Sequence, residues 1–190
     1  MAKISEESIA YSTAALQRGD VKEAIAIRNL EFGQESGSFD DYMVRTMNFI
    51  LGRTPALLSD CPPEFLDPLR IAAAMMELWG EAGIKRFVTI EGEWSYRFGP
   101  DTIAYMMRSH ACFLRSLEDI RQVGISNVRL ISGRGDDDCE ACRAVDDKPF
   151  TVDTVPEIPL VTCTCSDKFG CRVIVTADPN PTRKRKSRRR

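Results

Sequence analysis

Five of the seven cysteines in this chain fall within 33 residues, and this cluster constrains the fold more than any other feature. The spacing is Cys139-x2-Cys142, then twenty residues, then Cys163-x-Cys165-x5-Cys171. Thiolates from a C-x2-C pair reach one ion at about 2.3 Å, and a second group of cysteines completes the tetrahedron that structural Zn²⁺ prefers. Such a metal contributes folding free energy on the order of 10 kcal/mol. The sequence therefore predicts a small zinc-ribbon-like module with one structural Zn²⁺.

The cluster offers five cysteines for four ligand positions. We favour Cys139, Cys142, Cys163 and Cys171 as the metal ligands, with Cys165 as the alternate ligand. Two other interpretations stay open, namely an iron–sulfur cluster on the same thiolates, or reduced thiols without a metal. A redox-active C-x2-C pair normally opens a helix in a thioredoxin-like βαβ unit. The residues around the first pair do not predict such a unit, so a structural metal is the preferred interpretation.

The chain has no pattern typical of secretion or of membrane insertion. The first seven residues lack the apolar stretch of a secretory signal, and no apolar run approaches the roughly 18 to 20 residues of a membrane span. In a reducing compartment clustered cysteines bind metal more often than they form disulfides. We therefore expect an intracellular protein without a membrane partner. Cys61 and Cys112 are isolated and are expected to be packed in the interior.

Residues 1–83 are expected to form a helical region. Asp20 is the predicted N-cap of a helix over 21–30, and the Gly-Asp turn that contains it is typical of a helical hairpin. Ser38 is the predicted N-cap of a second helix over 39–51. Both segments carry apolar residues at helical spacing, so one face of each helix is expected to contact the core.

Two longer helices are predicted further along the chain. One follows Pro62 and Pro63, and the other begins near Pro100. His110, the only histidine, falls on the apolar face of the second of these helices. We therefore expect it to be a buried, hydrogen-bonded residue and not a metal ligand or a general base. The apolar stripes consist of Phe65, Leu69, Ala72, Met76 and Trp79 in the first helix and Ile103, Met107, Leu114 and Leu117 in the second.

Residues 84–126 are expected to contain a short β-hairpin before the second of these helices, with both packed on the helical region. Apolar and polar residues alternate on either side of a glycine turn, which predicts a hairpin over 86–98. Its second strand would carry Trp94, Tyr96 and Phe98.

The last part of the chain is expected to be a metal-bound β module over 127–177, followed by a disordered tail over 178–190. Short strands are predicted at 127–132, around 149–152 and around 172–176. The tail is interrupted by prolines, highly charged and free of apolar anchors. Together these patterns predict an α+β protein with a mainly helical N-terminal region.

Charge is distributed unevenly along the chain, although the formal net charge is only -2. Without the tail, residues 1–182 carry 19 basic and 28 acidic side chains, so the body is acidic. Phosphate binding depends on lysines and arginines spread over a contacting face, and such a contact would have to use the tail. The candidate nucleic-acid-binding residues are Arg183, Lys184, Arg185, Lys186, Arg188, Arg189 and Arg190.

The residues around the cysteines follow a recognisable order. A predicted strand leads into Asp138-Cys-Glu-Ala-Cys, then into Asp146-Asp-Lys-Pro-Phe, and Ile158-Pro-Leu-Val-Thr-Cys precedes Gly170-Cys-Arg. This order resembles the C-terminal cysteine module of phage head-morphogenesis (minor head) proteins of the Mu F type, over residues 127–176 only. In that family a D-x-C-x2-C pair is followed by a D-G-K-x-F turn and a C-R-C end. The matching positions are Cys139, Cys142, Asp146, Lys148, Cys163 and Cys171.

Three positions depart from the family pattern. Asp147 replaces the turn glycine, Leu160-Val-Thr replaces a common His-Pro approach, and Val173 replaces the last cysteine of C-R-C. The resemblance implies a virion-associated or cytoplasmic role with capsid or portal components as protein partners. It does not extend to the helical N-terminal region, and the oligomeric state is not predicted.

Three classes of function follow from these patterns. The first is a non-enzymatic structural or interaction protein, in which zinc makes a small β module rigid. The second is a zinc-ribbon nucleic-acid-binding protein that uses the basic tail. An enzyme is not expected, because catalytic zinc keeps an open ligand position and an all-cysteine site fills it. The acidic run Asp136–Asp138 is expected to form a hydrated turn and not a Ca²⁺ or Mg²⁺ site.

Overall fold

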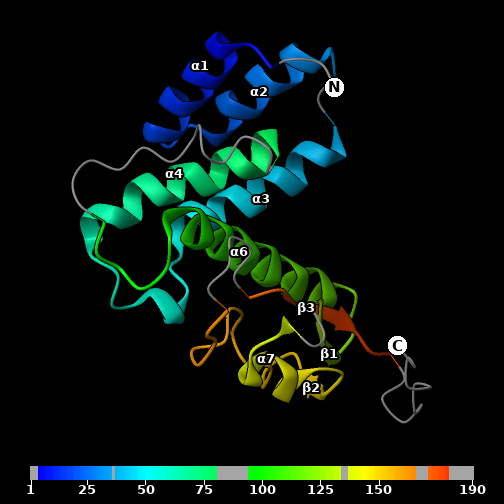
Figure 1. The fold of residues 1–190 in the computed structure, drawn as a ribbon. Coiled ribbons are helices and arrows are strands. Elements are labelled where there is room, and N and C mark those ends of the chain that lie inside the picture. The colour runs from blue at the N-terminus through cyan, green and yellow to red at the C-terminus, as the bar shows by residue number, and fades with distance from the viewer. Residues whose placement is uncertain (1–3, 36, 81–93, 134–136, 166–170, 180–190) are drawn as a thin grey trace.

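The computed structural model describes residues 4–35, 37–80, 94–133, 137–165 and 171–179. Within these ranges a body of helices lies above a small sheet, and one long helix runs between them (Figure 1). The predicted α+β class is confirmed. The helices are α1 (Glu6–Gln17), α2 (Val21–Phe32), α3 (Ser38–Gly52), α4 (Pro63–Trp79), α6 (Pro100–Gln122) and α7 (Glu140–Val145), with a 3-10 turn η1 (Ala56–Leu58). The strands are β1 (Asn127–Ser132), β2 (Pro149–Thr151) and β3 (Val173–Ala177).

The helix α2 begins where the sequence predicts. The Asp20 carboxylate accepts a hydrogen bond from the Glu23 backbone N–H at 2.9 Å, which satisfies one of the free donors of the first turn. Gly19, at φ 78°, turns the chain between α1 and α2, and these two helices pack side by side. The predicted helical hairpin is therefore confirmed.

The predicted start of α3 is wrong by one residue. Ser38 is the first helical residue and Gly37 is the N-cap. The cause is Asp40, whose carboxylate accepts a hydrogen bond from the Gly37 N–H at 3.2 Å and another from the Asn29 side-chain amide at 3.0 Å. The helix α4 begins one residue earlier than predicted, with Pro63 as its first residue, since a proline in the first turn needs no N–H partner.

The helix α6 connects the two parts of the fold. It packs against α3 and α4 on the side of the helical body and against β3 on the side of the sheet. Ile103 and Met107 are almost completely buried on its inner face, as the apolar spacing predicts. No helix in the described ranges is long and apolar enough to cross a membrane.

The second strand of the predicted hairpin is a loop. Trp94 and Ser95 have no regular structure and Tyr96 to Phe98 form bends, while the rest of the predicted hairpin, 86–93, lies outside the described residues. The alternation of apolar and polar residues over 94–98 does not reflect a strand, since individual side chains of this loop make their own contacts with the helical body. The Trp94 ring packs on Phe65 with centroids 4.8 Å apart, and Arg97 donates a hydrogen bond to the Leu57 carbonyl at 2.6 Å.

The sheet has the order β2-β1-β3, and both pairings are antiparallel. Val128 and Leu130 of the central strand are fully buried, so its inner face closes a small core. The three predicted strands are confirmed within one or two residues. The basic tail beyond residue 179 lies outside the described part of the chain.

The turn between α7 and β2 has an unusual backbone conformation. Asp147 has φ 54°, a left-handed conformation in which a Cβ atom costs about 1–2 kcal/mol and which glycine adopts freely. The turn therefore has the backbone shape that a glycine-containing turn would have.

We expect Asp147→Gly to leave the free energy of unfolding within about 1 kcal/mol of the wild type. Removal of the Cβ relieves the backbone strain, and this gain offsets the loss of a half-exposed ion pair with Arg129. Asp147→Val should lower it by about 1–2 kcal/mol, since a β-branched residue is strained at this φ. Urea unfolding of both variants measures the difference. Equal stability of the valine and glycine variants would contradict this account of the turn.

His110 is buried where α6 faces the cysteine module, with only 4% of its surface exposed. Its Nδ1 lies 2.8 Å from the Ile158 carbonyl oxygen, and since a carbonyl only accepts, Nδ1 carries the proton. Burial lowers the pKa of His110, and the Arg53 charge lowers it further; the Ile158 hydrogen bond and the Glu157 carboxylate, 3.7 Å away, oppose these effects without outweighing them. The prediction of a buried, hydrogen-bonded histidine is confirmed.

A lowered pKa in the folded state predicts how stability depends on pH. Below the ordinary histidine pKa of 6.5 the unfolded chain binds a proton that the folded chain resists. The free energy of unfolding should therefore decrease as the pH falls below about 6.5. His110→Gln keeps an N–H donor but does not titrate, so it should show a shallower decrease in the same buffer. Identical pH profiles for the two proteins in urea unfolding would show that His110 makes no contribution.

Candidate metal centre

The first two cysteines are placed by α7. Cys139 is the N-cap of this helix, and its carbonyl accepts a hydrogen bond from the Arg143 N–H at 3.0 Å. Cys142 lies in the first turn, so both side chains leave the same end of the helix. A short helix therefore starts at the C-x2-C pair, which the sequence analysis does not predict. The flanking strands β1 and β2 are antiparallel, so the unit is not the parallel βαβ unit of thioredoxin-like proteins.

The other three cysteines come from two further segments. Cys163 and Cys165 lie in the loop after β2, where the Cys163 N–H donates to the Leu160 carbonyl at 2.8 Å and forms a turn. Cys171 lies two residues before β3. Segments that are distant in the sequence thus converge on one point beside the sheet.

The sulfurs of the five cysteines form one cluster around Cys142. Cys142 Sγ is 3.7 Å from Cys163 Sγ, 4.0 Å from Cys165 Sγ and 3.5 Å from Cys171 Sγ. Cys139 Sγ is 3.9 Å from Cys163 Sγ. Two ligands at about 2.3 Å from one ion, at the tetrahedral angle of about 109°, are about 3.8 Å apart. The sulfur spacing therefore fits a single tetrahedral metal ion.

Four of these cysteines form one compact group. The sulfurs of Cys139, Cys142, Cys163 and Cys165 all lie within 4.8 Å of one another, so they could hold a metal ion. The favoured ligand Cys171 is also in the cluster, in contact with Cys142. The structure thus brings together every candidate ligand of the sequence, and the choice between Cys165 and Cys171 stays a prediction.

Ionisation of the cluster is governed by contacts among the sulfurs. Burial acts to raise the pKa of the Cys139 thiol, but backbone N–H groups of Thr164 and Cys142, with neighbouring thiols, outweigh it and lower the pKa to about 6. The thiols of Cys142 and Cys163 lower the pKa of Cys171 to about 3, because they donate to its thiolate. The same donation raises the pKa of Cys142. The thiolates are thus stabilised by hydrogen bonds from neighbouring thiols, and a metal ion would displace the protons of those thiols.

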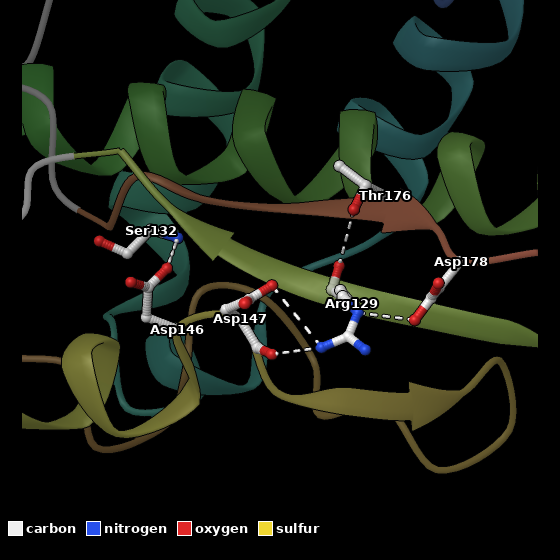
Figure 2. Close-up of polar contacts among 6 residues, drawn as sticks. All are labelled: Arg129, Ser132, Asp146, Asp147, Thr176 and Asp178. Carbon is white, nitrogen blue, oxygen red and sulfur yellow. Dashed lines mark hydrogen bonds and ion pairs between the residues drawn. The ribbon is translucent and has the colours of Figure 1, made fainter. Parts of the chain in front are cut away.

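Two aspartates fix the ends of α7 to the end of β1. Asp146, directly after the helix, accepts a hydrogen bond from the Ser132 N–H at 2.8 Å (Figure 2). Asp138, directly before Cys139, accepts one from the Ser132 hydroxyl. Both contacts restrict the helix that carries the first two cysteines. The sequence interpretation missed this role, since Asp138 is buried and does not lie in a hydrated turn.

Arg129, three residues before Ser132 on β1, connects three parts of the module (Figure 2). Its Nε donates to the Asp178 carboxylate at 2.6 Å and its Nη1 to the Asp147 carbonyl at 2.7 Å. The side chains of Arg129 and Asp178 are only 12% and 13% exposed. This arginine on β1 therefore holds both the turn after α7 and the end of β3. A charged residue in the middle of a predicted strand was the available sequence signal.

The remaining predicted residues lie apart from the cluster. Cys61 is buried in the helical body, as expected. Cys112 on α6 is partly buried and lines a groove between α6 and β3. Burial raises the pKa of both thiols. The candidate nucleic-acid-binding residues 183–190 lie outside the described residues.

Comparison with protein-family models, curated proteins and solved structures gives no match for this chain. The chemistry of the cysteine cluster therefore rests on its geometry. That geometry supports metal binding.

Proposed function

We propose that this protein is a non-enzymatic structural or interaction protein whose cysteine module is organised by one structural Zn²⁺. The observation that carries the proposal is the sulfur spacing of 3.5–4.0 Å around Cys142, which suits one tetrahedral ion. A [4Fe–4S] cluster places four iron atoms between its cysteine ligands and needs more widely spaced sulfurs. Zinc is therefore the preferred occupant among the metals that thiolates select.

The proposed role of the metal is structural because of its ligands. Catalytic zinc keeps one position open for water or substrate, whereas four thiolates complete the tetrahedron. The chain's only histidine donates to the Ile158 carbonyl and so holds a loop instead of assisting a reaction at the metal. These features support a role in assembly.

The proposed zinc would also support the contact between the module and the helical body. The loop that leads to Cys163 and Cys165 is held by three polar contacts, two from α6 and one from the helical body. Arg121 donates to the Val152 carbonyl at 2.9 Å, the Ala56 N–H donates to the Glu157 carboxylate at 2.7 Å, and His110 donates to Ile158. A metal that orders this loop would therefore order the docking surface as a whole. The partners that we propose are proteins, and the resemblance to phage minor head modules favours capsid or portal components of a virion.

Purified protein should contain one zinc per chain by elemental mass spectrometry. Cys142→Ser should lose it, since the Cys142 sulfur lies within 4.0 Å of the sulfurs of Cys163, Cys165 and Cys171. A strong chelator should then remove ordered structure from residues 127–177, because the short strands gain folding free energy on the order of 10 kcal/mol from the metal. Far-UV circular dichroism and amide hydrogen exchange measure this loss.

The matched control is Cys112→Ser, which removes a thiol outside the cluster and should keep one zinc per chain. Iron in place of zinc would contradict the zinc assignment. Metal-free protein of unchanged stability would contradict a structural role for any metal.

A second candidate function follows from the separation of charge in the sequence. The body over residues 1–182 is acidic, whereas seven basic residues are concentrated at 183–190. We propose, as the alternative, that this segment binds the phosphates of a nucleic acid without reading its sequence. Such binding depends on the release of counterions and is therefore sensitive to salt.

The alternative predicts that affinity for a random-sequence DNA duplex falls steeply between 50 and 200 mM salt, with a slope of about -0.9 for each phosphate contacted. Deletion of residues 183–190 should abolish the binding, whereas Cys142→Ser should retain the tail contact. Fluorescence anisotropy measures both. Binding that survives the deletion would exclude the tail as the contact.

A further inference from the structure

The cluster contains one sulfur more than a tetrahedral ion can bind, and this extra sulfur is in direct contact with the others. Cys165 Sγ lies 4.0 Å from Cys142 Sγ, and Cys171 Sγ lies 3.5 Å from it. Both values are close to the separation of about 3.8 Å between two ligands of one tetrahedral ion. Each of these two cysteines is thus placed to share an ion with Cys142. Neither is excluded by burial, since both are at most 5% exposed.

The two candidate ligands have different neighbours within the cluster. Cys165 contacts Cys139, which completes the group whose sulfurs are all within 4.8 Å. Cys171 contacts Cys163 as well as Cys142, so it lies against the edge that these two sulfurs form. An ion bound by Cys139, Cys142, Cys163 and Cys165 would therefore have the unbound sulfur of Cys171 next to two of its ligands.

We propose that Cys165 and Cys171 are interchangeable fourth ligands, so that one metal ion moves between two sets that share Cys139, Cys142 and Cys163. The inference rests on the proposed function, because it needs a metal in the cluster. In the exchange one metal–sulfur bond breaks as the other forms. The incoming sulfur binds as a thiolate and the outgoing sulfur leaves as a thiolate, so the number of thiolates bound to the ion is unchanged.

The exchange would regulate how the module is held together. Cys171 is tied to the sheet, because its sulfur accepts hydrogen bonds from the backbone N–H groups of Val173 in β3 and of Leu160. Cys165 belongs to the loop that docks on the helical body through Glu157 and Ile158. The ion therefore links the first pair of cysteines to β3 in one state and leaves β3 unlinked in the other. A partner that binds β3 would favour one of the two states.

The test compares Cys165→Ser, Cys171→Ser and the double variant with the wild type, all as full-length chains. Zinc content and competition with a chelator are measured for each. Each single variant should keep one zinc per chain and lose only about twofold in affinity if both states are equally populated. The double variant should lose the metal. In wild type loaded with ¹¹³Cd²⁺, the metal nucleus should couple to the β-protons of both Cys165 and Cys171.

The outcomes separate this proposal from the one on which it rests. If the wild type binds zinc but one single variant alone loses it, the ligand set is fixed and the exchange is refuted. Loss of zinc in both single variants would also refute it, since both sulfurs would then be required together. Cadmium coupling to only one of the two cysteines would have the same meaning. A wild type without metal would overturn the proposed function itself.

Discussion

The contact of five cysteine sulfurs is the interaction on which the C-terminal module depends. The strands are short, since β1, β2 and β3 have six, three and five residues, and a sheet of this size is marginally stable alone. The crowded thiols cannot all ionise, because each new thiolate would be buried beside another. A divalent cation would remove this conflict and add metal–sulfur bonds to a small apolar core. The proposed zinc would therefore be a structural requirement of the module.

Polar contacts around the cluster explain how its first two ligands are held in place. Asp138 and Asp146 bracket α7 and both bind Ser132 at the end of β1. Arg129, further back on the same strand, holds the Asp147 carbonyl and Asp178. The central strand thus positions the α7 helix at one end and the two outer segments at the other. Partly buried charged groups of this kind specify one arrangement, because each has a single partner geometry that compensates for its burial.

The helix α6 makes the module and the helical body interdependent. One face of this helix lies against α3 and α4, and another lies near β3 and the loop that carries two of the cysteines. His110 is neutral in this setting because burial outweighs the attraction of Glu157. Its hydrogen bond to a carbonyl in the cysteine loop connects the stability of the two parts.

The sequence by itself determined the helices with strong caps, the three strands and the presence of a cysteine cluster, because these depend on local spacing. Asp20 caps α2 as expected, Pro63 starts α4, and the apolar stripe of α6 is buried. The loop at Trp94 to Phe98 shows the limit of such patterns, since alternation arises there from separate contacts with the helical body. The N-cap of α3 also depended on a distant residue, because Asn29 helps to position Asp40.

Tertiary structure alone decided how the cysteines are arranged. Spacing in the sequence cannot tell which sulfurs meet, because the loop after β2 and the start of β3 can approach α7 in several ways. Chain folding placed both Cys165 and Cys171 against Cys142, and it buried Asp138 against Ser132. These outcomes depend on contacts between segments far apart in the chain. Local propensity and residue spacing carry no information about such contacts, and for that reason only the folded structure could reveal them.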